Sequence, residues 1–188
     1  MPASCRLRNP ASSLLLPWVT VMQIRRFKPG EEMDLWHLFH DAVHHINAAD
    51  YTSEQLNAWS PDQIDIGKWR ASLRNISPFV VEQERQLIGY ADVQPSGYVD
   101  HFYVHHLWQR RRVGTLLMQI ILEVAKQDAI DNLFADVSVT AKPFFESWGF
   151  AVEKEQYVQI HKVALKNYRM AKSLGLRTDR TAISRNHV

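Results

Sequence analysis

A basic loop that leads into a glycine-led helix carries the residues of this sequence that are best suited to chemistry. The segment runs from Tyr103 to Leu117 and contains Gln109, three consecutive arginines at 110–112, and Gly114. Its pattern predicts a strand, a loop and a helix, and a helix start offers unpaired backbone N–H groups and the positive end of the helix dipole. A glycine there lets a ligand approach the backbone closely. The segment therefore predicts an anion site suited to a pyrophosphate, and a solvated basic loop that caps a helix is the alternative.

Composition indicates a soluble globular protein built around one domain. The chain has 188 residues, of which 46% are hydrophobic and 22% are charged, as is typical of globular domains. The single cysteine, Cys5, excludes an intramolecular disulfide framework and a cysteine-rich zinc site, and it fits a reducing cytoplasm. A net charge of +2 does not favour a nucleic-acid partner. The apolar run at 14–19 is too short to span a bilayer, so we predict a cytoplasmic protein without a membrane partner.

The two ends of the chain differ from the part between them. Residues 1–21 hold a short apolar stretch interrupted by Pro17, which we interpret as a disordered extension, with Met22 as a candidate start. Residues 171–188 are basic and poor in apolar side chains, which is typical of a flexible solvated tail, and a basic contact arm is the alternative. No linker or repeat divides residues 22–170, so we expect them to form the folded domain.

Apolar periodicity predicts a mixed order of helices and strands. Apolar residues recur at helical spacing over 31–46 and form a wide arc over 113–127, which predicts two long helices. Thr52 and Gln55 match a capping box at the start of a short helix that ends at Trp59. Short turns separate three successive strands, which we expect to be antiparallel, and a crossover helix then favours a parallel pair. The predicted strands are 22–27, 79–81, 87–93, 98–104, 133–139, 152–160 and 161–165, and the other predicted short helices are 62–74 and 142–148.

Two motifs in register resemble the GNAT superfamily of N-acetyltransferases. The basic loop is similar to the superfamily's Gln/Arg-x-x-Gly-x-Gly/Ala pattern, with Gln109 first, Gly114 last, and Arg112 in place of the first glycine. The segment 138–150 is similar to Asn-x-x-Ala-x-x-Leu-Tyr-Glu-Lys-x-Gly-Phe. In that segment Ala141, Glu146, Gly149 and Phe150 are in register, Ser138 replaces the asparagine, and Phe145 replaces the tyrosine. With the segment 50–59, the stretch 140–146 looks like the YafP-type branch of uncharacterised GNAT acetyltransferases.

The resemblance implies a fold and a cosubstrate. The fold class would be α/β (α+β), with a mixed, mostly antiparallel central sheet, a splayed parallel strand pair and helices on both faces. The strands 98–104 and 133–139 would diverge, and the pantetheine arm of acetyl-CoA would lie in the opening. The implied acetyl-CoA-binding residues are Phe102, Tyr103, Val104, Gln109, Arg110, Arg111, Arg112, Val113, Gly114, Thr115, Ser138, Phe144 and Phe145.

The same resemblance implies direct attack of a neutral amine on the thioester. The family's usual proton donor is the tyrosine that Phe145 replaces, so either Tyr157 or Tyr103 serves instead, or the thiolate leaves unassisted. His101 and Asp100 are the candidate bases, and because neighbours on a strand point to opposite faces, at most one of them faces the cleft. Asp92 is a candidate to reach the acceptor ammonium.

The histidines of the first predicted helix and three tryptophans are interpreted as structural residues. His40 and His44 have a spacing that can hold a metal on a helix, but no third ligand is evident, so we predict a solvated helix face and no metal site. Lining of the acceptor pocket is the remaining alternative for these histidines. Trp36, Trp59 and Trp69 are assigned to the core rather than to a substrate wall.

The resulting prediction is an N-acetyltransferase that moves an acetyl group from acetyl-CoA to a primary amine of a small molecule, an amino acid or a protein. One alternative acceptor is the amine of a charged tRNA. A catalytically weak acyl-CoA-binding or sensing module is the alternative outside enzymes. Dimers are common in the superfamily, so a homodimer is an alternative to a monomer.

Overall fold

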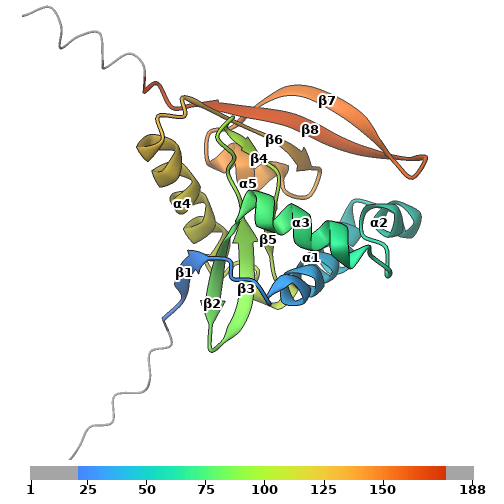
Figure 1. Cartoon of the computed structure of the whole chain (residues 1–188). Coiled ribbons are helices and arrows are strands. Elements are labelled where there is room, and N and C mark those ends of the chain that lie inside the picture. Colours follow the sequence, from blue (N-terminus) through green and yellow to red (C-terminus); the bar gives the residue numbers. More distant parts are fainter. Residues whose placement is uncertain (1–20, 177–188) are drawn as a thin grey trace, which may run out of the picture.

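Two four-stranded sheets with helices packed against them make up the fold. The computed structural model describes residues 21–176, and the predictions for 1–20 and 177–188 lie outside the described residues. The first sheet has the order β1-β2-β3-β5 and the second β4-β6-β8-β7 (Figure 1). The strands are β1 Gln23–Arg26, β2 Phe79–Gln83, β3 Gln86–Ala91, β4 Tyr98–Val99, β5 Phe102–Val104, β6 Asn132–Ser138, β7 Ala151–Ile160 and β8 Val163–Ser173.

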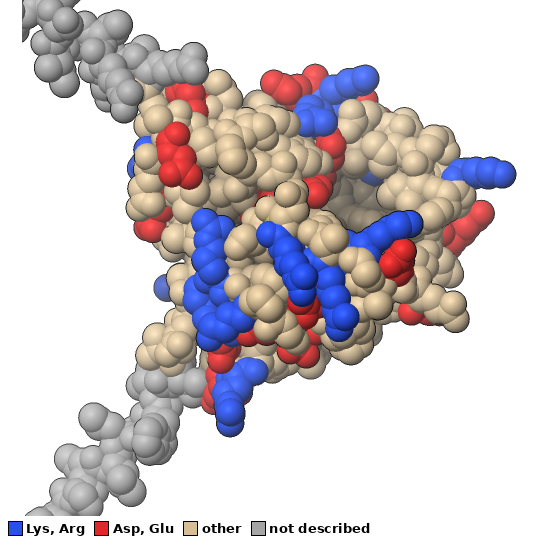
Figure 2. Space-filling view, viewed as in Figure 1, with Lys and Arg blue, Asp and Glu red and all other residues tan. Residues whose placement is uncertain are grey.

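Helices cover both faces of the first sheet, as predicted. The helices are α1 Glu32–Ile46, α2 Ser53–Trp59, α3 Ile66–Ile76, α4 Val113–Gln127 and α5 Lys142–Ser147, with short 3-10 turns η1 Asn47–Ala49 and η2 His106–Trp108. In Figure 1, α4 lies on one side of the first sheet and α1 with α3 on the other. The bounds of α4 match the prediction, and the capping box of α2 is confirmed because the side chains and backbone N–H groups of Thr52 and Gln55 bond reciprocally. Figure 2 shows a hollow between the β7–β8 ribbon and the helices α2 and α3.

The splayed parallel pair is confirmed, but the strand predicted at 98–104 is divided. Its first part, β4, pairs in parallel with β6, at Tyr98 with Phe134 and Val99 with Ala135. Its second part, β5, leaves β6 and pairs antiparallel with β3. One chain segment therefore belongs to both sheets, and the sheet predicted as a single central one opens into two at this fork.

The side chain of Asp92 holds the fork in place. Asp92 is fully buried and follows β3 directly. Its Oδ1 accepts the backbone N–H groups of His101 at 2.6 Å and Asp100 at 3.2 Å, and its own N–H donates to the His101 carbonyl at 3.1 Å. The two residues that link β4 to β5, Asp100 and His101, therefore donate their backbone N–H groups to one carboxylate and not to a neighbouring strand. The prediction that Asp92 reaches the acceptor ammonium is wrong because the side chain is fully buried, including Oδ2, which has no hydrogen-bond partner among the described residues.

The last strand is longer than predicted. β8 continues through Ala171, Lys172 and Ser173, which we had assigned to the tail. Ala171 pairs with Phe134 on one side and with Ala151 on the other, so the segment is held by two neighbouring strands. The strand predicted at 161–165 is wrong at its start, because residues 161 and 162 form the turn that reverses β7 into β8.

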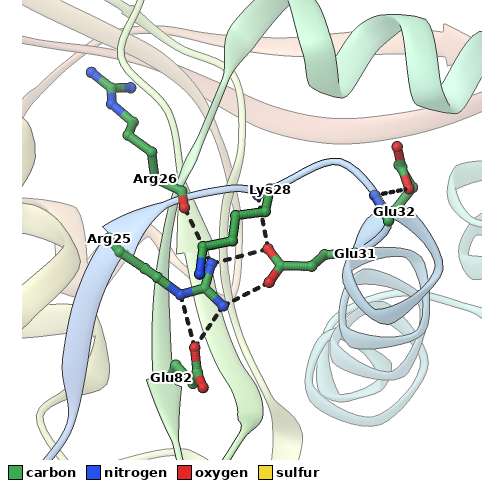
Figure 3. Close-up of polar contacts among 7 residues, drawn as sticks. Arg25, Arg26, Lys28, Glu31, Glu32 and Glu82 are labelled. Carbon is green, nitrogen blue, oxygen red and sulfur yellow. Dashed lines mark hydrogen bonds and ion pairs between the residues drawn. The ribbon is translucent and has the colours of Figure 1, made fainter.

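A polar cluster fixes the start of α1 against the first sheet (Figure 3). The Arg25 guanidinium on β1 donates to Glu31, just before α1, at 2.7 and 3.0 Å, and to Glu82 on β2 at 2.8 Å. Glu31 also accepts the Lys28 N–H at 2.9 Å. One arginine thereby links two strands to the helix that covers them. Among residues 21–176, no helix has the length and apolar character needed to cross a membrane.

Removal of the Asp92 carboxylate should destabilise the fork. Asp92→Ala leaves two partly buried N–H groups without their acceptor, so we expect the free energy of unfolding in urea to fall by roughly 1–3 kcal/mol. Asp92→Asn keeps an acceptor oxygen and should lose less. An alanine variant as stable as the wild type would show that the carboxylate does not hold the fork.

The close approach of α4 to β3 gives a second prediction. A Cβ added at Gly89 would lie 2.6 Å from Val113 Cγ1, so Gly89→Ala should lower the free energy of unfolding by about 1–3 kcal/mol. Val113→Ala removes the obstructing methyl group, and the double variant should lose less than the sum of the two single losses by at least about 0.5 kcal/mol. Strict additivity in this double-mutant cycle would contradict the packing.

Candidate active site

The start of α4 offers unpaired backbone donors beside two exposed arginines. The first bond into the helix runs from the Leu116 N–H to the Arg112 carbonyl at 3.1 Å, and no side chain caps this end. The N–H groups of Val113, Gly114 and Thr115 are therefore available to a ligand. Arg110 and Arg112 have φ values of 62° and 67°, which places Arg112 in the left-handed conformation that the family's glycine at this position accommodates without strain.

A cleft of about 710 Å³ begins at this helix end and runs between β5 and β6. The predicted residues that line it are Asp100, Phe102, Tyr103, Val104, Gln109, Arg110, Arg112, Val113, Gly114, Thr115, Ser138, Phe144 and Phe145. Arg111 does not line the cleft, because its guanidinium packs over the Trp108 ring at 4.9 Å. Nearly all of the predicted binding segment is thus brought together, and Arg111 is the exception.

The backbone of β5 faces the opening of the cleft. β5 is the last strand of the first sheet, and its single neighbour is β3. His101 and His105 direct their backbone groups at β3, since Asp92 donates to the His101 carbonyl and the His105 N–H donates to Ile88. Backbone groups alternate along an antiparallel strand, so those of Phe102 and Val104 point away from β3 into the gap. The Gln109 side chain already donates to the Val104 carbonyl at 2.9 Å, which ties the basic loop to this end of β5.

Aromatic rings form the wall of the cleft next to the helix start. The Phe102 ring lies 5.3 Å from that of Phe144 and 5.4 Å from that of Phe145, measured between centroids. Gly114 lets the Phe144 ring approach closely, because a Cβ at this position would lie 3.2 Å from that ring and the ring would have to shift. Phe145 is 3% exposed and carries no hydroxyl group, so this wall supplies packing and no proton.

Of the two candidate bases, Asp100 lines the cleft and His101 does not. The Asp100 side chain is 42% exposed. The His101 ring lies beside Trp69, Tyr90 and Tyr103, and its Nδ1 is 3.6 Å from Asp100 Oδ2. The two side chains are therefore neighbours, but only Asp100 meets a substrate in the cleft directly.

Of the two tyrosines predicted as proton donors, only Tyr103 is in the cleft. Burial, followed by a nearby Asp100, raises the pKa of Tyr103 well above its usual value, although a hydrogen bond with Trp59 acts in the opposite direction. The phenol therefore stays protonated over the physiological range. Tyr157 is 64% exposed on β7 and lies outside the cleft. Its position on a strand whose outer face meets solvent excludes it as a donor.

Several cleft residues were missed by sequence reasoning. Trp59 was assigned to the core but lines the cleft, together with Asn47, Thr140 and Asp136. The Asn47 amide donates to Thr140 Oγ1 at 3.4 Å, so the end of α1 meets the loop after β6. Asp136 could have been found from the period of two, because it precedes Ser138 by two positions on the same strand. The others come together only in the tertiary structure.

The histidines of α1 have structural partners. His40 Nδ1 lies 3.0 Å from Ser60 Oγ, and His44 Nε2 lies 2.8 Å from the Ser60 carbonyl. Both histidines thus hold the end of α2 against α1 and do not form a fully solvated face. A separate group, Asp41, His105 and His106, places three ligand atoms within 4.8 Å of one another. His105 Nδ1 accepts the Leu107 N–H at 3.2 Å, and the rings of His105 and His106 stack with 4.5 Å between centroids.

Comparisons with known proteins agree with this geometry. Residues 47–172 match the family model described as the acetyltransferase (GNAT) domain. The chain is 30% identical over 149 residues to the uncharacterised N-acetyltransferase YafP of Escherichia coli K12, a match that covers 79% of this chain and 94% of YafP.

Solved structures show the same fold. A GCN5-related N-acetyltransferase from Rhodopseudomonas palustris superposes with a TM-score of 0.78 at 27% identity, covering 83% of this chain and 98% of that one. The PaiA N-acetyltransferase from Thermoplasma acidophilum, solved in complex with coenzyme A, superposes with a TM-score of 0.64 at 14% identity, covering 81% and 99%. The family model spans most of the described residues and includes the fork, the basic loop and the cleft, and the chain therefore belongs to the GNAT family of acetyltransferases.

Proposed function

We propose that this protein transfers an acetyl group from acetyl-CoA to a primary amine by direct attack of the amine. One observation carries the proposal: a cleft between two diverging strands, edged by unpaired backbone groups of β5, ends at the unpaired N–H groups of α4. A cosubstrate with an anionic head and an extended amide-bearing arm matches both ends of this arrangement. The related fold solved with coenzyme A supports the assignment.

In this proposal each part of acetyl-CoA has a place in the cleft. The pyrophosphate lies at the start of α4 beside Arg110 and Arg112. The pantetheine arm follows the edge of β5 as a missing strand would. The thioester carbonyl then meets the Phe102 N–H, which stabilises the oxyanion as the tetrahedral intermediate forms.

The chemical step requires a neutral amine and a protonated leaving thiol. Asp100 takes a proton from the acceptor ammonium, directly or through a water molecule. The neutral amine nitrogen then forms a bond to the carbonyl carbon and loses its second proton to solvent, and the carbon–sulfur bond breaks as the intermediate collapses. The proton that Tyr103 gives to the thiolate is replaced from solvent. Because Phe145 has no proton to give, we assign protonation of the thiolate to the Tyr103 phenol, which burial keeps protonated.

A catalytically weak acyl-CoA-binding module is the second candidate. The observation that favours it is the aromatic wall, in which Phe145 occupies the position of the family's proton donor. Release of free thiol from acetyl-CoA in the presence of an amine panel separates the two candidates. Turnover establishes the transferase, whereas thermal stabilisation by acetyl-CoA without turnover establishes the binding module.

A bulky side chain at Gly114 should block cosubstrate binding. Gly114→Trp places an indole between the start of α4 and Phe144, so we expect the Kd for coenzyme A, measured by calorimetry, to rise at least tenfold. Leu107→Trp is the matched control, because Leu107 is 66% exposed and lies outside the cleft. Unchanged affinity in a folded Gly114→Trp protein would contradict the placement of the pyrophosphate.

The proton donor can be tested by removing one hydroxyl group. Tyr103→Phe should lower kcat by roughly 10-fold to 100-fold, within the range of general acid catalysis, and should leave the KM for acetyl-CoA within about twofold, since the ring and its packing remain. Tyr157→Phe should leave kcat unchanged. Full kcat in the Tyr103 variant would show that the thiolate leaves unassisted.

A further inference from the structure

Charge is segregated along the cleft. Among the described residues that line it, the charged side chains are Arg110, Arg112, Asp100 and Asp136. The bond from Gln109 to the Val104 carbonyl places the arginines at one end of β5, and Asp100 precedes its other end. The three residues of β5 separate these two ends by about 10 Å, at about 3.3 Å per residue.

Asp136 has no capacity left for a ligand. Arg169 approaches its two oxygens at 3.0 and 3.1 Å, and the Gln156 amide donates to it at 2.7 Å. The Tyr98 hydroxyl lies 3.4 Å away. Arg169 does not line the cleft, so its guanidinium does not face an anionic group there.

Asp100 is the carboxylate that remains for the acceptor. It has no lysine or arginine partner among the described residues, and its nearest cationic group is the ring of His101 at 3.6 Å, charged only if protonated. His101 itself does not line the cleft. A cationic amine in the cleft can therefore pair with Asp100, whereas an acidic group would meet a carboxylate and no lysine or arginine.

The uncharged lining of the cleft is mostly apolar and aromatic. Tyr103 from β5 lies near Asp100 and its side chain meets Trp59 from α2, and Ala42 and Ile46 from α1 also line the cleft. Asn47 and Thr140 supply neutral polar groups, and Thr140 is held by Asp50 at 2.7 Å. Aromatic rings attract ammonium groups and pack against flat apolar bodies.

We infer that the acceptor is a primary amine on an apolar or aromatic body, with no carboxylate or phosphate next to the amine. The inference rests on the proposed function and narrows its acceptor class. It disfavours free amino acids, because their α-carboxylate would be desolvated beside Asp100 without a cation to pair with.

Matched acceptors test the inference on the wild-type enzyme. The pairs are phenethylamine with phenylalanine and tyramine with tyrosine, and kcat/KM is measured by thiol release from acetyl-CoA. We expect each amine to exceed its amino acid at least tenfold. Phenylalaninamide has the branched shape of phenylalanine without the negative charge, so it should return to within about threefold of phenethylamine. If kcat/KM for phenylalaninamide stays as low as that for phenylalanine, the enzyme discriminates by the shape of the acceptor and not by its charge. That result would overturn the inference.

A gain-of-function variant adds an independent test. Thr140→Lys in an Asp50→Asn background, which removes the carboxylate 2.7 Å from Thr140, places an unpaired cation at the wall of the cleft and should raise the phenylalanine-to-phenethylamine ratio of kcat/KM at least fivefold. The neutral Thr140→Gln in the same background is the matched control and should leave the ratio unchanged. An unchanged ratio in a folded lysine variant counts against the assigned acceptor position.

Calorimetry separates failure of the inference from failure of the proposed function. Phenethylamine and phenylalanine are titrated into the protein saturated with coenzyme A. Preferential binding of the amine without turnover keeps the inference and overturns the proposed transferase. Equal or better use of phenylalanine overturns the inference and keeps the transferase. Absence of binding by every amine overturns the inference.

Discussion

The whole arrangement depends on one buried carboxylate at the point where a strand leaves one sheet for another. Asp92 accepts the N–H groups of Asp100 and His101, which have no strand partner there. Burial of those N–H groups without an acceptor would cost about 1–3 kcal/mol each. Because the side chain satisfies them, β4 can stay with β6 while β5 turns away to β3, and the gap between the two sheets remains open.

The fork between β4 and β5 also determines which functional side chains lie on each side of the sheet. Residues on one face of β5 pack with Phe144 and Phe145 next to α4, while Tyr103 and His101 face α1 and α3. Asp100, at the fork itself, faces the cleft. Cations therefore gather where the anionic head of a cosubstrate would lie, and the free carboxylate lies where an amine would approach. The divergence of β4 and β5 that makes room for the cosubstrate also positions Asp100, the carboxylate beside which the amine acceptor would bind.

Local patterns predicted the parts of this site that are local in the chain. The wide apolar arc of α4, the basic loop before it and the register of the second motif depend on neighbouring residues, and the structure brings them together in the cleft. The division of 98–104 into two strands was not predictable, because it depends on Asp92, which follows another strand. Trp59 and Asn47 reach the cleft only through the packing of α1 and α2, and Tyr157 resembled a proton donor by type alone. The extension of β8 past Ala171 was missed because its basic residues are typical of a tail, whereas two paired strands hold them.

Backbone amide hydrogen exchange by NMR tests the central claim most directly, because the claim concerns individual N–H groups. If the arm of acetyl-CoA takes the place of a strand along β5, saturation with coenzyme A should slow exchange of the Phe102 amide strongly. The Tyr103 amide, already directed at β3, should change little. A Phe102 amide that exchanges at the same rate with and without coenzyme A, in a protein that binds it, would contradict the account.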